Sequence, residues 1–185
     1  MLTVTQLEKN YGGQTLFRDV SLQFNAGCRY GVVGANGSGK STFLRILMGD
    51  EEPSAGEVSL PRRAKIGVLS QDHFQYEDVA IIDVVLMGHV ELWEAMVAKE
   101  ELLAKAHEHF DATGFARLED VIEKHEGYAM EARAAEILEG LNIRTEQHRQ
   151  PLSVLSGGFK LRVLLAQTLA SSPDILLLDE PTNHL

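Results

Sequence analysis

The stretch Gly34-Ala35-Asn36-Gly37-Ser38-Gly39-Lys40-Ser41 decides the fold of this chain. Its glycines let consecutive backbone N–H groups approach anionic oxygens, which a Cβ atom would obstruct. Lys40 is placed to reach the β- and γ-phosphates of a nucleotide, and the Ser41 hydroxyl is a ligand for a magnesium ion. The motif therefore predicts a phosphate-binding loop for ATP or GTP.

The flanks of this loop fit the strand-loop-helix context that the motif requires. Cys28 to Val33 is an apolar run that predicts a buried strand, with the Cys28 side chain packed in the core. After the loop, apolar residues recur at helical spacing and predict a helix from Ser41 to Met48. The positive end of its dipole would then point at the phosphates.

Composition and charge limit the class of protein. A chain of 185 residues with 44% hydrophobic and 24% charged residues predicts one globular domain. It has a single cysteine, no signal peptide and no apolar stretch near the ~20 residues that span a bilayer. We therefore expect a cytoplasmic protein without a membrane partner.

The net charge of −10 argues against DNA as a partner and against wrapping of nucleic acid in general. The one dense basic cluster is Arg62-Arg63 with Lys65. We interpret it as a solvated strand edge in preference to a phosphate contact.

A second motif, Pro173 to Pro181, is an apolar run of strand length that ends in two acids. It predicts a buried parallel strand whose carboxyl end reaches the nucleotide, because ligands of open α/β sheets bind at that end. Asp179 can hold magnesium through its water shell, and Glu180 can activate an attacking water.

A third motif, Leu155-Ser156-Gly157-Gly158, precedes leucines at helical spacing. Ser156 is a good N-cap residue, and the two glycines leave the first backbone amides of the helix accessible. This helix start could bind an anion, such as the γ-phosphate of a nucleotide that is held elsewhere.

These three motifs, with Gln71 after the predicted strand Lys65 to Leu69, resemble an ATP-binding-cassette nucleotide-binding domain over nearly the whole chain. The resemblance implies an α/β fold: a P-loop NTPase of the ABC type, with a mixed sheet core, a helical subdomain and a helical arm insert. It also implies ATP and Mg²⁺ as cofactors.

The resemblance assigns roles to single residues. It makes Lys40 and Glu180 catalytic and places Ser41, Gln71 and Asp179 at the magnesium ion. The nucleotide-binding set that it implies is Tyr11, Gly34, Ala35, Asn36, Gly37, Ser38, Gly39, Lys40, Ser41, Thr42, Ser156, Gly157 and Gly158. In this set Tyr11 stacks on adenine, although packing of its ring on the Gly12-Gly13 turn is an alternative. The signature residues at 156–158 close over ATP that is bound to a second cassette.

Within the cassettes, three segments resemble the ABC-F family of soluble, tandem-cassette ATPases of translation: residues 11–17, residues 87–94 and the ending Glu-Pro-Thr-Asn-His-Leu. The resemblance is to a first cassette that is truncated, because the C-terminal part of the cassette is missing and His184 lies too early to be its switch histidine. The implied partners are the ribosome and a second cassette, in the same parent chain or as a homodimer partner.

The predicted layout has a nucleotide-binding core at 1–87, a helical hairpin arm at 88–127, and the rest of the helical subdomain, the signature helix and the Walker B strand at 128–185. In the arm, a turn at Asp111 to Gly114 separates two stripes. The first is made by Leu92, Met96, Leu103, Ala106 and Phe110, and the second by Leu118, Val121, Ile122 and His125. A further helix is predicted from Met130 to Leu141. Because the arm is acid-rich, its charge gives no support to RNA contact, and a ribosomal protein partner and a purely stabilising role both stay open.

The predicted function is ATP binding and hydrolysis that drives the closure of two cassettes. Phe159 departs from the family pattern, since it stands where the signature usually has glutamine. Two alternatives stay open: an ATP-binding subunit of an ABC transporter, and a nucleotide-binding fragment without turnover.

Overall fold

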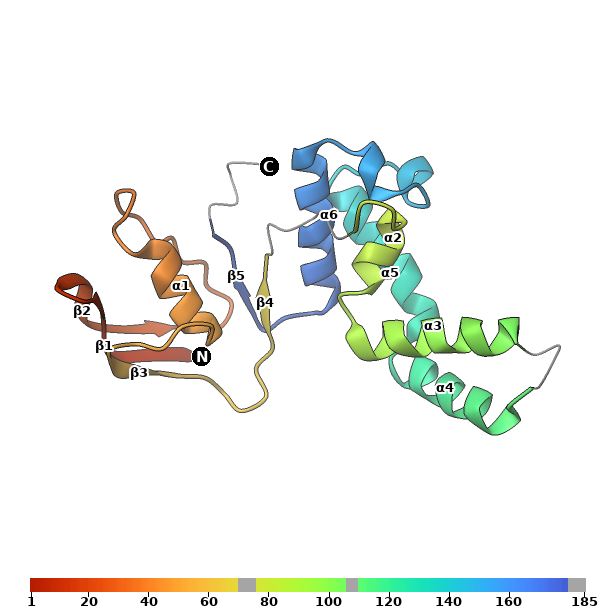
Figure 1. Ribbon diagram of the computed structural model, residues 1–185, viewed down its shortest axis with the longest axis horizontal. Helices are drawn as coiled ribbons and strands as arrows, with labels where there is room; N and C mark the ends of the chain where they lie inside the picture. The colour runs from red at the N-terminus through yellow and green to blue at the C-terminus, as the bar shows by residue number, and fades with distance from the viewer. Residues whose placement is uncertain (70–75, 106–109, 180–185) are drawn as a thin grey trace. The chain divides into compact units, whose positions relative to one another are not determined.

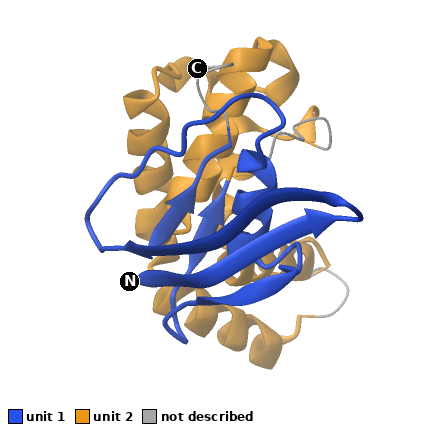
Figure 2. Cartoon of the chain, turned by 90° about the vertical axis from the view of Figure 1, so that its left-hand side faces the viewer, with its two compact units in different colours: residues 1–68, 174–179 blue, residues 69–173, 180–185 orange. Residues whose placement is uncertain are grey.

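The computed structural model describes residues 1–69, 76–105 and 110–179. The chain divides into two compact units, which Figure 2 shows in blue and orange. We call residues 1–68 with 174–179 the core unit, and the described residues within 69–173 the helical unit.

The first sheet of the core unit is antiparallel, with the strand order β2-β1-β3. Its strands are β1 (Leu2–Tyr11), β2 (Gln14–Phe24) and β3 (Ala55–Ser59). A tight turn joins β1 to β2, where Tyr11 pairs with Gln14 and Gly12 adopts a φ of +56° (Figure 1). This register brings the start of β2 beside the end of β1.

Helix α1 (Lys40–Met48) supplies the other half of the core of this unit. Phe43, Ile46 and Leu47 from the helix are buried with Leu2, Val4 and Leu7 from β1. The spacing of the β1 residues departs from strict alternation after Val4, where a register shift includes Gln6 at a φ of +47°. This bulge returns Leu7 to the buried face of the strand.

A second, parallel pair of strands completes the core unit: β4 (Ile66–Val68) and β5 (Ile175–Leu177). The Asp174 carboxylate accepts a hydrogen bond from the Lys65 backbone N–H at 2.8 Å and fixes the start of the pair. This confirms both predicted strands and their parallel direction, although Ile175 and Leu177 are half-buried and not fully buried.

The predicted buried strand from Cys28 to Val33 is wrong. These residues form no strand, the Val33 side chain is 95% exposed, and Cys28 is exposed and not packed in the core. An apolar run becomes a strand only when a neighbouring backbone pairs with it, and the described ladder of this sheet pairs β4 with β5 alone. The Arg62, Arg63 and Lys65 cluster is exposed, as predicted.

The helical unit contains five α-helices in its described residues: α2 (Ile81–Leu86), α3 (Val90–Ala104), α4 (Ala112–Lys124), α5 (Gly127–Gly140) and α6 (Gly157–Ala170). Short 3₁₀ turns at Thr145–Gln147 and Leu152–Val154 connect α5 to α6. The buried residues Val84, Leu138 and Leu164 come from α2, α5 and α6, which pack together. The predicted helices near 130–141 and after Ser156 are thus confirmed.

Helices α3 and α4 pack together as the predicted helical hairpin (Figure 1). The predicted turn at Asp111 to Gly114 is wrong, because α4 begins at Ala112 and the Asp111 carboxylate caps it by accepting from the Thr113 and Gly114 N–H groups. Leu103 and Phe110 are exposed, so the apolar stripe is shorter than predicted, while Ala106 lies outside the described residues. No helix in the part of the chain that the structure describes has the length and apolar character for a bilayer crossing.

Candidate nucleotide-binding site

The loop before α1 has the backbone geometry of an anion cradle. The Ser38 N–H donates to the Ala35 carbonyl at 3.1 Å, and Gly37 and Gly39 adopt φ values of +80° and +93°. Gly39 is the N-cap of α1 and provides no side-chain cap, so the first N–H groups of the helix stay available to a ligand. Residues with a Cβ rarely adopt these conformations, which explains the glycines at positions 37 and 39.

Strand β2 supports the base of this cradle. A Cβ atom added to Gly39 would lie 3.2 Å from Phe17 Cδ1 and 3.3 Å from Leu16 Cβ. The Phe17 ring also packs edge-on against Phe43 of α1, with ring centroids 5.8 Å apart. Gly39, at the end of the loop, therefore lies close against β2, where a larger residue would force the Leu16 and Phe17 side chains to move.

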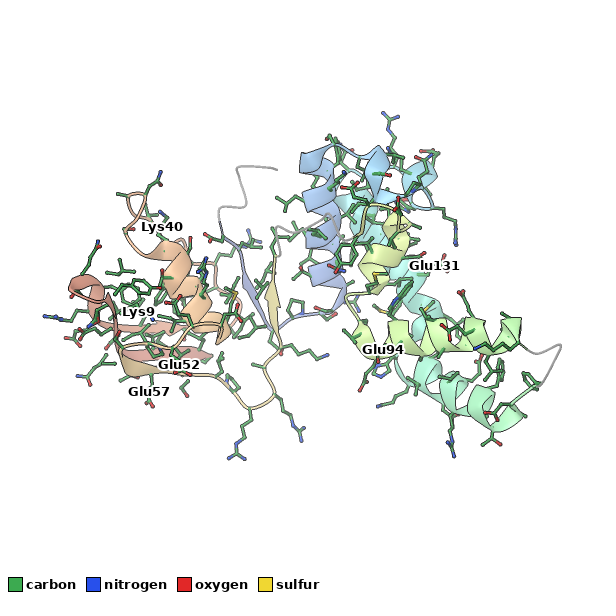
Figure 3. The ribbon with its side chains drawn as sticks, viewed as in Figure 1. Lys9, Lys40, Glu52, Glu57, Glu94 and Glu131 are labelled. Carbon is green, nitrogen blue, oxygen red and sulfur yellow. The ribbon has the colours of Figure 1, made fainter. Side chains whose placement is uncertain are left out.

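The Lys40 side chain turns back over the loop, at the start of α1 (Figure 3). Its ammonium group donates to the Gly34 carbonyl at 3.0 Å and to the Ala35 carbonyl at 3.2 Å. A cation so placed beside open N–H groups makes the loop strongly attractive to phosphate oxygens. The structure thus brings together the loop glycines, Lys40 and the helix start that the motif predicts.

Oxygen donors for a magnesium ion lie in the same core unit. The Ser41 hydroxyl is in the first turn of α1, and the half-buried Asp179 follows the end of β5. A hydroxyl and a carboxylate suit Mg²⁺, which prefers hard oxygen ligands and keeps part of its water shell. Gln71 and Glu180, also predicted for this site, lie outside the described residues, as does His184.

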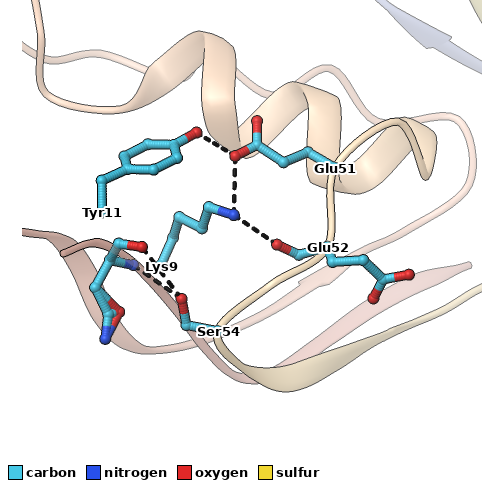
Figure 4. Close-up of polar contacts among 6 residues, drawn as sticks. Lys9, Tyr11, Glu51, Glu52 and Ser54 are labelled. Carbon is cyan, nitrogen blue, oxygen red and sulfur yellow. Dashed lines mark hydrogen bonds and ion pairs between the residues drawn. The ribbon is translucent and has the colours of Figure 1, made fainter.

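Tyr11 ends β1 and is 52% exposed. Its hydroxyl donates to Glu51 Oε1, and the Lys9 ammonium lies 4.9 Å from the centre of its ring (Figure 4). The Tyr11 hydrogen bond, and secondly Lys9, lower the pKa of the Glu51 carboxyl below its usual value.

Sequence reasoning missed Lys9 and Glu51. One signal was present, because Lys9 lies two residues after Leu7 and shares its buried face of β1. A lysine at such a position needs a partner for its charge. The sequence does not show which carboxylate provides it.

The signature segment lies in the helical unit, at the start of α6. Ser156 occupies the predicted N-cap position, but its side chain makes no capping hydrogen bond. Its hydroxyl, the exposed Gly157 and the helix N-terminus are consequently placed to receive an anion. A Cβ atom added to Gly157 would meet no atom within 4 Å.

Two contacts fix the first turn of α6 within this unit. Lys160 Nζ pairs with Glu77 Oε1 at 2.6 Å, and the Arg162 guanidinium lies 4.8 Å from the centre of the Phe159 ring. Arg162 also donates to the Leu141 carbonyl, at the end of α5. Phe159, which stands in place of the usual glutamine, therefore serves as a stacking partner for Arg162.

Comparison with known proteins gives the family. The family described as ABC transporter matches residues 17–183. The chain is 48% identical to "Probable ATP-binding protein YbiT" of Escherichia coli O157:H7, over 100% of this chain and 35% of that protein. It is 38% identical to the tylosin resistance ATP-binding protein TlrC of Streptomyces fradiae, over 100% of this chain and 35% of that protein.

A further relative is the energy-dependent translational throttle protein EttA of Mycobacterium tuberculosis, at 34% identity over 99% of this chain and 33% of that protein. The chain thus spans about a third of the length of these curated relatives.

Solved structures agree with the fold. One is cbiO1 of Clostridium perfringens, part of the ABC transporter complex cbiONQ, with a TM-score of 0.64, 25% identity, and coverage of 100% of this chain and 66% of that one. Another is a bacterial ABC transporter cassette solved as a dimer, with a TM-score of 0.62, 25% identity, and coverage of 100% and 76%. The chain belongs to the ABC transporter family of ATP-binding cassettes.

Proposed function

We propose that this cassette hydrolyses Mg²⁺-ATP and that its closure on a second cassette acts on the ribosome in translation. The observation that carries the proposal is the phosphate loop itself, in which the Lys40 ammonium lies over the loop carbonyls next to an uncapped helix start. A site of this kind favours the charge that gathers on the transferred phosphoryl group.

The residues predicted to bind the phosphates and the magnesium ion each have a part in the proposal. The loop N–H groups and Lys40 hold the phosphates, and Ser41, Thr42, Gln71 and Asp179 surround the magnesium and the phosphates. The bound metal would neutralise phosphate charge. Glu180 would orient and deprotonate the attacking water, which makes the reaction one of positioning and charge stabilisation.

The second cassette completes the site in this proposal. Ser156, Gly157 and Gly158 of one cassette would close over ATP bound to the other. The accessible start of α6 supports this role, and so does the dimeric bacterial cassette among the similar structures. Closure and reopening would then follow ATP binding and hydrolysis.

A role at the ribosome is supported by the name of one relative, a translational throttle protein, at 34% identity. In this proposal, residues 1–87 remain the nucleotide-binding core, 88–127 the arm and 128–185 the remainder of the cassette, although the compact units group the described residues within 69–87 with the helices and 174–179 with the core unit. The arm either touches a ribosomal protein or stabilises the cassette.

A transporter subunit is the second candidate, because several similar structures are cassettes of ABC transporters. Co-sedimentation distinguishes a transporter subunit from a cassette that acts on the ribosome. With ATP present, we expect the protein to sediment with purified ribosomes, and sedimentation with membrane vesicles alone would favour the transporter.

Hydrolysis is tested by phosphate release from ATP, with the Glu180→Gln and Lys40→Ala variants in parallel. We expect Glu180→Gln to keep ATP binding and lose turnover, and Lys40→Ala to lose binding. Turnover that is unchanged in Glu180→Gln would refute its role as the base. Binding without any turnover, in the presence of a second cassette, would favour the nucleotide-binding fragment.

A further inference from the structure

The buried ammonium of Lys9 ties the end of β1 to the segment that follows α1. The residue is only 9% exposed, and a buried ammonium is costly unless it is paired. Its Nζ atom lies 2.9 Å from Glu51 Oε1 and donates to the Glu52 carbonyl at 2.7 Å (Figure 4). Both partners follow Gly49, the C-cap of α1.

The same Glu51 oxygen holds Tyr11. It accepts a hydrogen bond from the Tyr11 hydroxyl, while the Lys9 ammonium lies 4.9 Å from the ring centre. The ring is therefore fixed at its hydroxyl and covered on one face by a cation, an arrangement that the ring quadrupole favours. The Tyr11 side chain nonetheless stays 52% exposed, so a large part of it is open to solvent.

We propose that Lys9 and Glu51 are positioning residues for the nucleotide base. They would hold the Tyr11 ring with one face against the Lys9 ammonium and present the other face to the purine of ATP. A ring that is already fixed loses less rotamer freedom when the base stacks on it, so the bound state is favoured. This inference rests on the proposed function, in which the loop binds the phosphates of ATP.

The experiment compares two ligands, Mg²⁺-ATP and Mg²⁺-tripolyphosphate, by calorimetry on the 185-residue chain. Only ATP has a base, so the ratio of the two affinities isolates the stacking contribution. Tyr11→Ala should lower this ratio by at least about fivefold, the usual range for base stacking on an aromatic residue. Glu51→Gln, Lys9→Met and Tyr11→Phe should each lower it by about two- to tenfold, because each removes a charge or a hydrogen bond that helps to hold the ring.

Two further variants sharpen the test. The double variant Tyr11→Phe with Glu51→Gln should lose less than the sum of the two single variants, since both changes act on the one contact between Tyr11 and Glu51. Glu57→Gln, an exposed carboxylate on β3 outside this cluster (Figure 3), should leave the ratio unchanged. Thermal unfolding of every variant checks that the chain still folds.

A ratio that falls in Tyr11→Ala but not in Glu51→Gln or Lys9→Met would overturn the positioning role while leaving stacking in place. An equal loss of affinity for ATP and for tripolyphosphate in the Lys9 and Glu51 variants would also overturn the positioning role. The two residues would then stabilise the phosphate loop and would not position the ring for the base. If the unaltered chain bound neither ligand, the proposed function itself would fall.

Discussion

The two glycines that bound α1 show how single residues shape the candidate site. Gly39 and Gly49 are the N-cap and C-cap of the helix, with φ values of +93° and +84°. They differ in their surroundings, since a Cβ atom would lie 3.2 Å from Phe17 at Gly39 and would meet nothing within 4 Å at Gly49. Alanine substitutions at the two positions therefore share the free-energy cost of a left-handed alanine. Only the substitution at Gly39 adds the cost of distorting the phosphate loop.

We expect Gly39→Ala and Gly49→Ala each to lower the free energy of unfolding by about 1–2 kcal/mol, because alanine disfavours the left-handed region. Only Gly39→Ala should also weaken ATP binding, by about tenfold, which corresponds to about 1.4 kcal/mol of loop distortion. Denaturant unfolding and ATP calorimetry on both variants check this. Equal ATP affinities for the two variants would contradict the role given to Gly39.

Among single residues, those of the phosphate loop are well predicted from the sequence. Gly34 to Ser41 are contiguous, and they bind phosphate mainly through their own backbone and side chains. The Lys9–Glu51–Tyr11 contact could not be predicted. Glu51 lies 40 residues after Tyr11, and only the packing of α1 on β1 brings them together.

Among the elements, the packing of α2 and α6 depends on the close approach of two backbones. A Cβ atom added to Gly88, which follows α2, would lie 2.2 Å from the Gln167 carbonyl oxygen of α6. Backbone atoms cannot move aside as a side chain can, so the two helices would have to separate.

Gly88→Ala should therefore lower the free energy of unfolding by about 1–3 kcal/mol, the cost of overpacking. The control is Gly140→Ala at the end of α5, where a Cβ atom meets nothing within 4 Å. It should change stability by less than about 1 kcal/mol and in the stabilising direction, since alanine is the better helix former. Urea denaturation measures both, and equal effects would show that no close approach exists at Gly88.

An ion pair between the two helices of the arm, with a hydrogen bond from α5 to its carboxylate, makes the stability of the fold depend on pH. Lys99 of α3 pairs with Glu119 of α4, and the Tyr128 hydroxyl of α5 donates to Glu119 at 2.9 Å. Lys99 first, and Tyr128 second, lower the pKa of the Glu119 carboxyl below 4.5. The contact thus stabilises the fold above about pH 4.5 and is lost as the pH falls through the lower pKa of the folded state.

Glu119→Gln should consequently be less stable than the unaltered chain at neutral pH, and the difference should shrink once the pH falls below about 4.5. Asp120→Asn, at an exposed carboxylate on the same helix, is the control. Urea midpoints across the acid range measure the effect. A difference that stays constant with pH would show that the Glu119 charge is not involved.

The sequence predicts an element correctly where the spacing of its apolar residues is enough to identify it, as for α1, α5 and α6. The strand at Cys28 to Val33 was not, since apolar character alone does not supply the neighbouring backbone that a strand requires. The start of α4 was misplaced because Asp111 is equally suited to a turn and to an N-cap.

In the whole molecule, we expect bound nucleotide to stabilise one compact unit more than the other. The phosphate loop and Asp179 belong to the core unit, while α3 and α4 belong to the helical unit. A ligand stabilises what it binds by mass action, by about 2.7 kcal/mol at a hundredfold excess over Kd.

Hydrogen exchange with and without Mg²⁺-ATP should therefore show the added protection in residues 34–48, with little change in the arm at 90–124. Asp179→Asn should reduce this protection and make it less dependent on magnesium. Protection that is spread evenly over both units would contradict a phosphate-binding loop that lies in the core unit.

The most direct test of the account is calorimetric titration of the chain with ATP, with and without Mg²⁺, beside the Lys40→Ala variant. We predict binding that requires both magnesium and Lys40, because the Lys40 ammonium over the loop and the hydroxyl of the adjacent Ser41 are the basis of the site. Binding that Lys40→Ala leaves unchanged, or no binding at all, would contradict the assignment of this loop as the nucleotide site.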